Sequence, residues 1–168
     1  MASEIELSVS HRVGQGAFAD VFCMRDSSRV CKILRADGNL RWLSGAEAIH
    51  HEELQAYRIA AASPTLRACV ARCFGHVVVA RVSSASGDDI TGEYLLGTAF
   101  ALERLSGPCE KAGGLDPTTF GHVHALLSAF DSVGIDAGDA SVFGYETART
   151  VKFIDFTTAW GTKLLTAL

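Results

Sequence analysis

Two acidic residues near the C-terminal end of the chain are candidates for phosphate chemistry. Asp139 ends the run Gly-Ile-Asp-Ala-Gly-Asp, and Asp155 follows the apolar pair at 153–154. One carboxylate in a turn and one at the end of an apolar strand could both face a phosphate group and its metal ion. This hypothesis of phosphoryl transfer requires a phosphate-binding loop and a partner lysine upstream, and the chain contains a candidate for each.

The candidate loop is the run Val-Gly-Gln-Gly-Ala-Phe-Ala-Asp-Val at residues 13–21. Glycine has no Cβ, so backbone N–H groups in such a turn can come close to a triphosphate. The third glycine of a G-x-G-x-x-G pattern is replaced by Ala19. The alternative is an ordinary Gly-x-Gly hairpin turn. Because the run lies between two predicted strands, it is not the strand-to-helix fingerprint of dinucleotide-binding proteins.

The candidate lysine is Lys32, in the middle of an apolar strand. A charge there either faces solvent on an alternating strand or is paired with an anion and a carboxylate, because an unpaired buried charge is costly. Glu52 and Glu53 on the next predicted helix can supply the carboxylate. Glu53 is preferred because Tyr57, four residues later, shares its helix face.

These residues must be positioned by an α+β fold. Residues 7–34 predict an antiparallel meander of strands. Residues 44–62 predict a helix that Ser63 and Pro64 end. Residues 77–82 and 94–105 read as two further strands, joined as a hairpin with a long polar tip.

A glycine-containing linker at residues 106–114 predicts a boundary between two lobes. Asp116 and Pro117 have the types expected at a helix start, and Gly134 the type expected at its end. Residues 142–143 and 151–154 predict a short hairpin, and the residues after Asp155 suffice for a loop and one short helix. The expected domains are residues 1–105, a five-stranded sheet with the Glu53 helix, and residues 106–168, a truncated and mostly helical lobe.

Composition narrows the class of partner. The chain has 168 residues and a formal net charge of −4, without clusters of lysine and arginine. Nucleic acid and anionic membranes are therefore not expected as partners, because both are bound through concentrated positive charge. No apolar run reaches membrane-spanning length, so a soluble protein is expected. The odd number of cysteines favours a reducing compartment, and no second Cys/His pair joins Cys69 and Cys73 at zinc-like spacing.

Taken in order, the candidate residues resemble the signature set of the protein-kinase-like superfamily. The residues that carry this resemblance are Gly14, Gly16, Val21, Lys32, Glu53, Asp139 and Asp155. The resemblance extends over nearly the whole chain and rests on residue order and predicted structural context. In its short length the chain is similar to minimal bacterial effector kinases of the OspG, NleH and HopBF kind, which are delivered into host cells by type III secretion. The runs ending at Asp139 and Phe156 also resemble the aminoglycoside and choline phosphotransferase branch.

The resemblance implies a minimal bilobal kinase-like fold, with ATP and Mg²⁺ as cofactors. The residues implied to bind ATP are Gly14, Gln15, Gly16, Ala17, Phe18, Ala19, Val21, Cys31, Lys32, Leu102, Glu103 and Leu105. Among them, the residues from Gly14 to Ala19 would cover the phosphates, Val21 and Cys31 would lie over the adenine, and Leu102 would lie at the back of the pocket.

The same resemblance implies the catalytic roles. Lys32, held by Glu53, would contact the α- and β-phosphates, and Asp155 would bind Mg²⁺. Asp139 would orient the acceptor hydroxyl and take its proton.

Three positions depart from the family pattern. Ala137 stands where the family has His or Tyr, and Thr157 stands where it has the glycine after Asp-Phe. Gly144 occupies the position expected for the Asn that binds a second metal ion, with Ser141 as a conceivable substitute. The chain also lacks an activation segment and the helical region that binds peptide substrates, so catalysis is expected to be slow or to depend on an activating protein partner.

The leading expectation is an ATP-dependent serine/threonine protein kinase that acts on a protein substrate, such as a host protein. As an effector it would pass from the bacterial cytoplasm into the host cytosol. One alternative is a pseudokinase that binds nucleotide or a partner protein without catalysis. The second alternative is a small-molecule phosphotransferase. This alternative is ranked last, because the chain lacks the long C-terminal helical region that builds the acceptor pocket in such enzymes.

Overall fold

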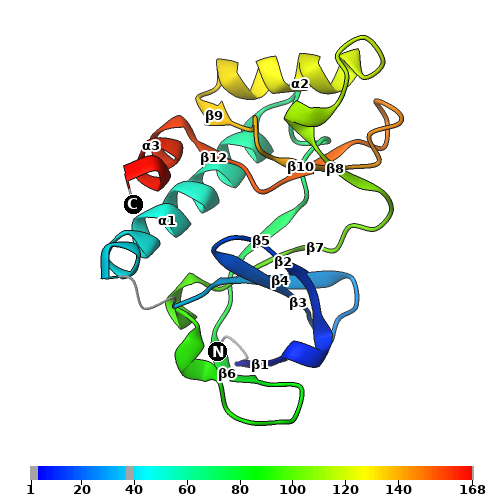
Figure 1. Cartoon of the computed structure of the whole chain (residues 1–168). Coiled ribbons are helices and arrows are strands. Elements are labelled where there is room, and N and C mark those ends of the chain that lie inside the picture. Colours follow the sequence, from blue (N-terminus) through cyan, green and yellow to red (C-terminus); the bar gives the residue numbers. More distant parts are fainter. Residues whose placement is uncertain (1–3, 37–39, 168) are drawn as a thin grey trace. The chain divides into compact units, whose positions relative to one another are not determined.

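The chain folds as an α+β protein with an antiparallel sheet and three helices (Figure 1). The computed structural model describes residues 4–36 and 40–167. Two compact units are present, one formed by Met1–Glu47 and Cys73–Arg104, the other by Ala48–Arg72 and Leu105–Leu168. The sequence predicts an N-terminal lobe that runs without interruption to residue 105. In the structure, Ala48–Arg72 belong to the second unit.

The first unit is built on a five-stranded sheet in which every neighbouring pair is antiparallel. Its strands, in spatial order, are β2 (Arg12–Gln15), β3 (Ala19–Cys23), β4 (Arg29–Leu34), β7 (Phe100–Glu103) and β5 (Cys73–His76). Short turns join β2 to β3 and β3 to β4, as the sequence predicts. The predicted antiparallel sheet is therefore confirmed.

Two further strands of this unit pair away from the sheet. β1 (Ile5–Ser8) runs parallel to β6 (Val79–Ser83), and a 3₁₀ turn, η1 (Val9–His11), leads from β1 to β2. The predicted hairpin between residues 77–82 and 94–105 is wrong, because β7 pairs with β4 and β5 instead. Two 3₁₀ turns, η2 (Thr91–Glu93) and η3 (Leu96–Thr98), separate β6 from β7 and replace the direct return that a hairpin requires.

Strand alternation gives this unit its hydrophobic core. Phe22 of β3 and Cys31 and Ile33 of β4 are fully buried and pack with Leu7 and Val82 of the β1–β6 pair. Burial of side chains of this size stabilises a fold by about 1.5–3 kcal/mol each. The other face of the same strands carries the residues that alternate with them.

The second unit combines helices with two small sheets. Its strands and helices include α2 (Gly121–Ser132), β9 (Ile135–Asp136), β12 (Thr157–Thr158) and α3 (Ala159–Ala167). A three-stranded antiparallel sheet has the order β11 (Lys152–Ile154), β10 (Ser141–Phe143) and β8 (Cys109–Lys111). The predicted hairpin of residues 142–143 and 151–154 is confirmed, and so is the short helix after Asp155. Strand β8 and the 3₁₀ turn η4 (Ala112–Gly114) lie in the segment that the sequence predicts as a linker.

Aromatic rings form the core of this unit. The Phe130 ring centroid lies 4.9 Å from that of Phe153 and 5.3 Å from that of Phe156. The Tyr57 ring lies 4.4 Å from Phe156. Tyr57 belongs to α1 (Leu40–Ala62), which begins before the expected residue 44 and ends at the expected residue 62. These contacts fix the segment after Asp155 against two helices.

Helix α2 is shorter than predicted. Asp116 Oδ2 accepts hydrogen bonds from the Thr119 backbone N–H (2.8 Å) and hydroxyl (2.7 Å), which closes a separate turn before the helix. The helix itself begins at Gly121. Gly134 ends this segment as predicted, since its φ of +78° is a conformation that favours glycine.

In the part of the chain that the structure describes, no helix combines the length and apolar character needed to cross a bilayer.

Candidate functional site

The candidate site in the second unit lies at one end of the β11–β10–β8 sheet. Lys111, Ser141 and Ile154 are cross-strand neighbours in one row of this sheet. Asp155 directly follows Ile154, and Asp139 comes two residues before Ser141. Since β10 and β11 are antiparallel, both aspartates leave the sheet at the same end. The strand register therefore places the two acidic residues that the sequence singled out at the same end of the sheet.

Asp139 is held through its backbone and exposes its carboxylate. The Ala140 N–H donates to the Ala137 carbonyl (3.1 Å), and Lys111 Nζ donates to the Asp139 carbonyl (2.7 Å). The same ammonium lies 3.6 Å from Asp139 Oδ2, and the aspartate side chain is 97% exposed. The backbone at Asp139 is thus held in place while its carboxylate faces solvent.

Asp155 has an unusual backbone conformation. Its φ is +59°, and among the described residues it is the only non-glycine with a positive φ. Such a conformation costs about 1–3 kcal/mol and is concentrated at functional sites. Ser141 Oγ donates a hydrogen bond of 3.4 Å to Asp155 Oδ2. Phe156, the next residue, is buried in the aromatic core.

Gly144 lies just beyond β10, at the end of that strand away from Asp139, because β10 begins two residues after Asp139. Its φ is +58°, and a Cβ added there would lie 2.5 Å from the Thr150 carbonyl oxygen. A side chain at position 144 would therefore require the Thr150 backbone to shift, and the correspondence of Gly144 with the metal-binding Asn of the kinase pattern stays a prediction. Ser141 is the β10 residue next to Asp155.

Two further residues complete the surroundings. Asp136 accepts hydrogen bonds from the Gly138 N–H (3.1 Å) and from Thr162 Oγ1 (2.8 Å), which ties the Asp139 turn to α3. Partial burial raises the pKa of the Cys109 thiol at the start of β8, and a hydrogen bond with Ser141 opposes this rise. The thiol is thus protonated at neutral pH.

The donor set is compatible with a weakly coordinated Mg²⁺. Within residues 4–36 and 40–167, no group of three or more His, Cys, Asp or Glu side chains is placed to hold a metal ion. Mg²⁺ is commonly bound through one or two carboxylates together with substrate phosphates and water. Asp155, with Ser141 beside it, fits a metal ion of that kind and does not form a complete protein cage.

The glycine turn of the first unit lies between two strands, as predicted. Gly14 and Gln15 belong to β2, and Ala19 begins β3. The Gly16 N–H donates to the Ala19 carbonyl (2.8 Å) and closes the turn. The Phe18 side chain at its tip is 46% exposed.

Register places three of the predicted nucleotide-binding side chains on one face of the sheet. Val21 pairs with Lys32, and Leu102 pairs with Val30, so these four residues share a face. Lys32 is half-buried. Cys31 lies on the opposite face, fully buried in the core. The expectation that Cys31 and Val21 cover the same ligand is therefore wrong, because their side chains lie on opposite faces of the sheet. Val30, the residue before Cys31, shares the face of Val21.

Three further predicted residues are divided between the two units. Glu53 is buried in α1, while its neighbour Glu52 accepts a hydrogen bond from Thr158 Oγ1. Glu53 belongs to the second unit and Lys32 to the first, so their pairing stays a prediction. Glu103 ends β7, and Leu105 is the first residue of its segment in the second unit.

No protein-family model and no curated protein matches this sequence. The resemblance to kinases is therefore carried by the residue pattern alone, and the roles of ATP, Mg²⁺ and a protein substrate stay predictions.

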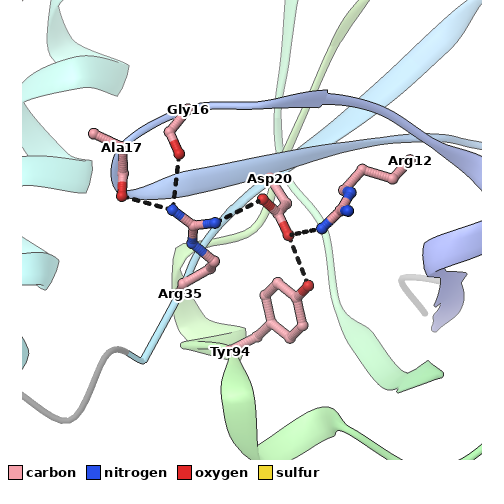
Figure 2. Close-up of polar contacts among 6 residues, drawn as sticks. All are labelled: Arg12, Gly16, Ala17, Asp20, Arg35 and Tyr94. Carbon is pink, nitrogen blue, oxygen red and sulfur yellow. Dashed lines mark hydrogen bonds and ion pairs between the residues drawn. The ribbon is translucent and has the colours of Figure 1, made fainter. Parts of the chain in front are cut away.

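Sequence reasoning missed a buried ionic cluster beside the glycine turn (Figure 2). Asp20 is fully buried, and its carboxylate lies 3.2 Å from Arg12 Nη1 and 3.4 Å from Arg35 Nη1. The Tyr94 hydroxyl donates to the same carboxylate (2.8 Å). Burial, followed by the neighbouring Asp20, raises the pKa of Tyr94 to about 12. The available signal was an aspartate on the strand face that also carries Phe22, where a charge requires partners.

Proposed function

We propose that this chain is an ATP-dependent kinase of minimal bilobal type that transfers the γ-phosphate to a hydroxyl group of a protein, with Ser and Thr as the first candidates. The observation that carries the proposal is the common end of β10 and β11, which has the exposed Asp139 before one strand and the Ser141–Asp155 hydrogen bond at the ends of the two strands. Phosphoryl transfer depends mainly on positioning and charge neutralisation, and this arrangement supplies a proton acceptor and a metal-binding carboxylate.

Each residue then has a distinct task. Asp139 orients the acceptor hydroxyl and receives its proton, for which an exposed carboxylate within hydrogen-bond reach is required. Lys111 keeps the Asp139 turn in place through the carbonyl contact of 2.7 Å. Asp155, with Ser141, would hold Mg²⁺, which neutralises phosphate charge when bound. The hydrogen bond between the Ser141 hydroxyl and the Asp155 carboxylate supports the proposed role in Mg²⁺ binding.

The first unit supports nucleotide binding. Its glycine turn has no Cβ at Gly14 or Gly16, which leaves room for a phosphate to approach the backbone amides at the tip. The sheet face of Val21, Lys32 and Leu102 combines apolar surface with one cation. An apolar surface and a nearby cation suit an adenine ring and its phosphates, respectively.

Thermal unfolding with ATP and Mg²⁺ tests the binding step. The wild-type chain should gain stability in a Mg²⁺-dependent way, and Lys32→Ala and Asp155→Ala should lose the gain. Lys163→Ala and Asp131→Asn, which change exposed charges elsewhere, should retain it. An unchanged melting temperature for the wild type at saturating ATP would contradict the proposal.

Transfer of labelled phosphate tests the chemical step. Asp139→Asn should reduce labelling of protein bands, including the chain itself and proteins of a host-cell lysate, by about 10²-fold or more. ATP binding should be unaffected, because the Asp139 side chain is solvent-exposed. Labelling of a small alcohol with no labelled protein would replace the proposal by a small-molecule phosphotransferase.

A pseudokinase is the second candidate. It is favoured by the buried Ala137, which occupies the position expected for His or Tyr in the kinase pattern, and by the single carboxylate at the candidate metal position. In that case ATP binding persists, and the wild type and Asp139→Asn show equal, background labelling. A partner protein that raises labelling by the wild type alone would exclude the pseudokinase and identify an activator.

A further inference from the structure

Arg35 contacts three consecutive carbonyl groups at the tip of the glycine turn. Its Nη2 atom donates to the Gly16 carbonyl (2.8 Å) and to the Ala17 carbonyl (2.6 Å). Its backbone N–H donates to the Phe18 carbonyl (2.9 Å). Figure 2 shows both side-chain contacts on the same side of the turn. The residue that directly follows β4 thus binds the carbonyls of all three residues between β2 and β3.

The direction of these carbonyls determines the direction of the amides. A trans peptide is planar, so the N–H of each residue points opposite to the carbonyl of the residue before it. Because the Gly16 and Ala17 carbonyls point toward the Arg35 guanidinium, the N–H groups of Ala17 and Phe18 point away from it. Neighbouring amides with a common direction form the kind of anion-binding concavity that phosphates occupy.

The guanidinium is itself anchored from below. Arg35 Nη1 lies 3.4 Å from Asp20 Oδ1, and Asp20 is fully buried. The other carboxylate oxygen binds Arg12 and the Tyr94 hydroxyl. A planar guanidinium can donate to a carboxylate and to carbonyls at the same time, which a lysine ammonium on a flexible stem does not reproduce.

We infer that Arg35 is a positioning residue that presets the glycine turn for phosphate binding, with Asp20 as its anchor. This inference rests on the proposed nucleotide-binding function. The turn has its binding conformation before the nucleotide arrives, so the ordering of its amides does not reduce the affinity for the phosphates. Arg12 serves as a natural control, because its guanidinium hydrogen bond goes to the same carboxylate, whereas the bonds to the Gly16 and Ala17 carbonyls come from Arg35.

Calorimetric titration of the whole chain with ATP plus Mg²⁺, and separately with adenosine, tests this role. Arg35→Met and Arg35→Lys should weaken ATP binding by about tenfold and leave adenosine binding unchanged, because only ATP has phosphates for the turn to bind. The lysine variant keeps the positive charge. Weaker ATP binding by Arg35→Lys would therefore reflect lost positioning of the turn and not lost electrostatic attraction to the phosphates. Arg12→Met should bind both ligands as the wild type does.

Hydrogen exchange without ligand supplies a readout that is independent of nucleotide. The hydrogen-bonded amides that close the turn, those of Gly16 and residue 35, should exchange faster in Arg35→Met and Arg35→Lys than in the wild type, and not in Arg12→Met. If the wild type binds neither ligand, the proposed function fails, while the exchange data still decide whether Arg35 fixes the turn. Equal ATP affinity and equal exchange in the wild type and Arg35→Lys would overturn the inference and leave the proposed function standing.

Discussion

Ser141 Oγ donates a 3.4 Å hydrogen bond to Asp155 Oδ2, linking the first residue of β10 to the residue that follows β11. The link lies at the sheet end that also carries Asp139. It orients a carboxylate whose backbone has a positive φ. The Ser141 hydroxyl on the neighbouring strand thus contacts the Asp155 carboxylate at the polar end of this small sheet.

Removal of this hydroxyl should weaken the metal dependence of nucleotide binding. In Ser141→Ala the Asp155 carboxylate loses its orienting partner, and loss of such a partner typically costs about 10–100-fold in metal affinity. When Mg²⁺ is titrated at a constant ATP concentration, Ser141→Ala should need more Mg²⁺ than the wild type to reach half of the rise in melting temperature. Ser132→Ala, which removes an exposed helix hydroxyl bonded to the Ala129 carbonyl, should keep the wild-type midpoint. Coincident Mg²⁺ titrations of the two variants would exclude a role for Ser141.

Gly144→Asn tests whether a metal ligand can be restored at the position suggested by the kinase pattern. The residue has a positive φ, and a Cβ there would lie 2.5 Å from the Thr150 carbonyl oxygen. The variant should lose about 1–3 kcal/mol of unfolding free energy in urea, as overpacked sites do, without any stronger Mg²⁺ dependence. Gly114→Asn is the matched control, because nothing lies within 4 Å of a Cβ at that glycine. Tighter Mg²⁺ binding by Gly144→Asn would contradict the assigned geometry.

Local patterns in the sequence correctly predicted the elements that carry the site. The glycine turn, the strand containing Lys32 and the hairpin before Asp155 depend on residues close together in the chain, and all three are present. Turn residues and alternation encode such features directly. The two aspartates at one sheet end follow from the same hairpin register.

Features that depend on distant residues were less predictable. The pairing of β6 with β1 joins the two ends of a long segment, and no local pattern distinguishes it from a hairpin with β7. Cys31 shows how a one-residue difference in alignment moves a side chain to the other face of a strand. Arg35 and Asp20 meet only because β3 and β4 are neighbours, so their role at the glycine turn required the structure.

Thr158 should stabilise the second unit by joining α1 to the start of α3. Its hydroxyl donates to Glu52 and accepts from the Gly161 N–H (3.0 Å). Thr158→Val preserves shape but leaves both partners unsatisfied, so the free energy of unfolding should fall by about 1–3 kcal/mol. Thr166→Val, whose hydroxyl bonds only within α3, should change it far less. Equal denaturation midpoints for the two variants would show that the Glu52 contact is energetically neutral.

The raised pKa of Tyr94 predicts a loss of stability at high pH. An unfolded tyrosine ionises near pH 10, whereas burial and then the Asp20 hydrogen bond raise the pKa of Tyr94 in the folded chain to about 12. Between these values the folded chain binds one more proton than the unfolded chain. The free energy of unfolding therefore decreases as pH rises, by up to about 1.4 kcal/mol per pH unit.

Urea unfolding of the wild type and Tyr94→Phe across this range isolates the effect. Phenylalanine cannot ionise, so the stability difference between the two proteins should stay constant below about pH 9 and then shift in favour of the variant up to about pH 12. The pKa of Cys31, which burial also raises to about 12, affects both proteins equally and cancels in the difference. Parallel stability curves through this range would mean that the Tyr94 hydroxyl ionises as readily in the folded chain as in the unfolded one, which its burial against Asp20 opposes.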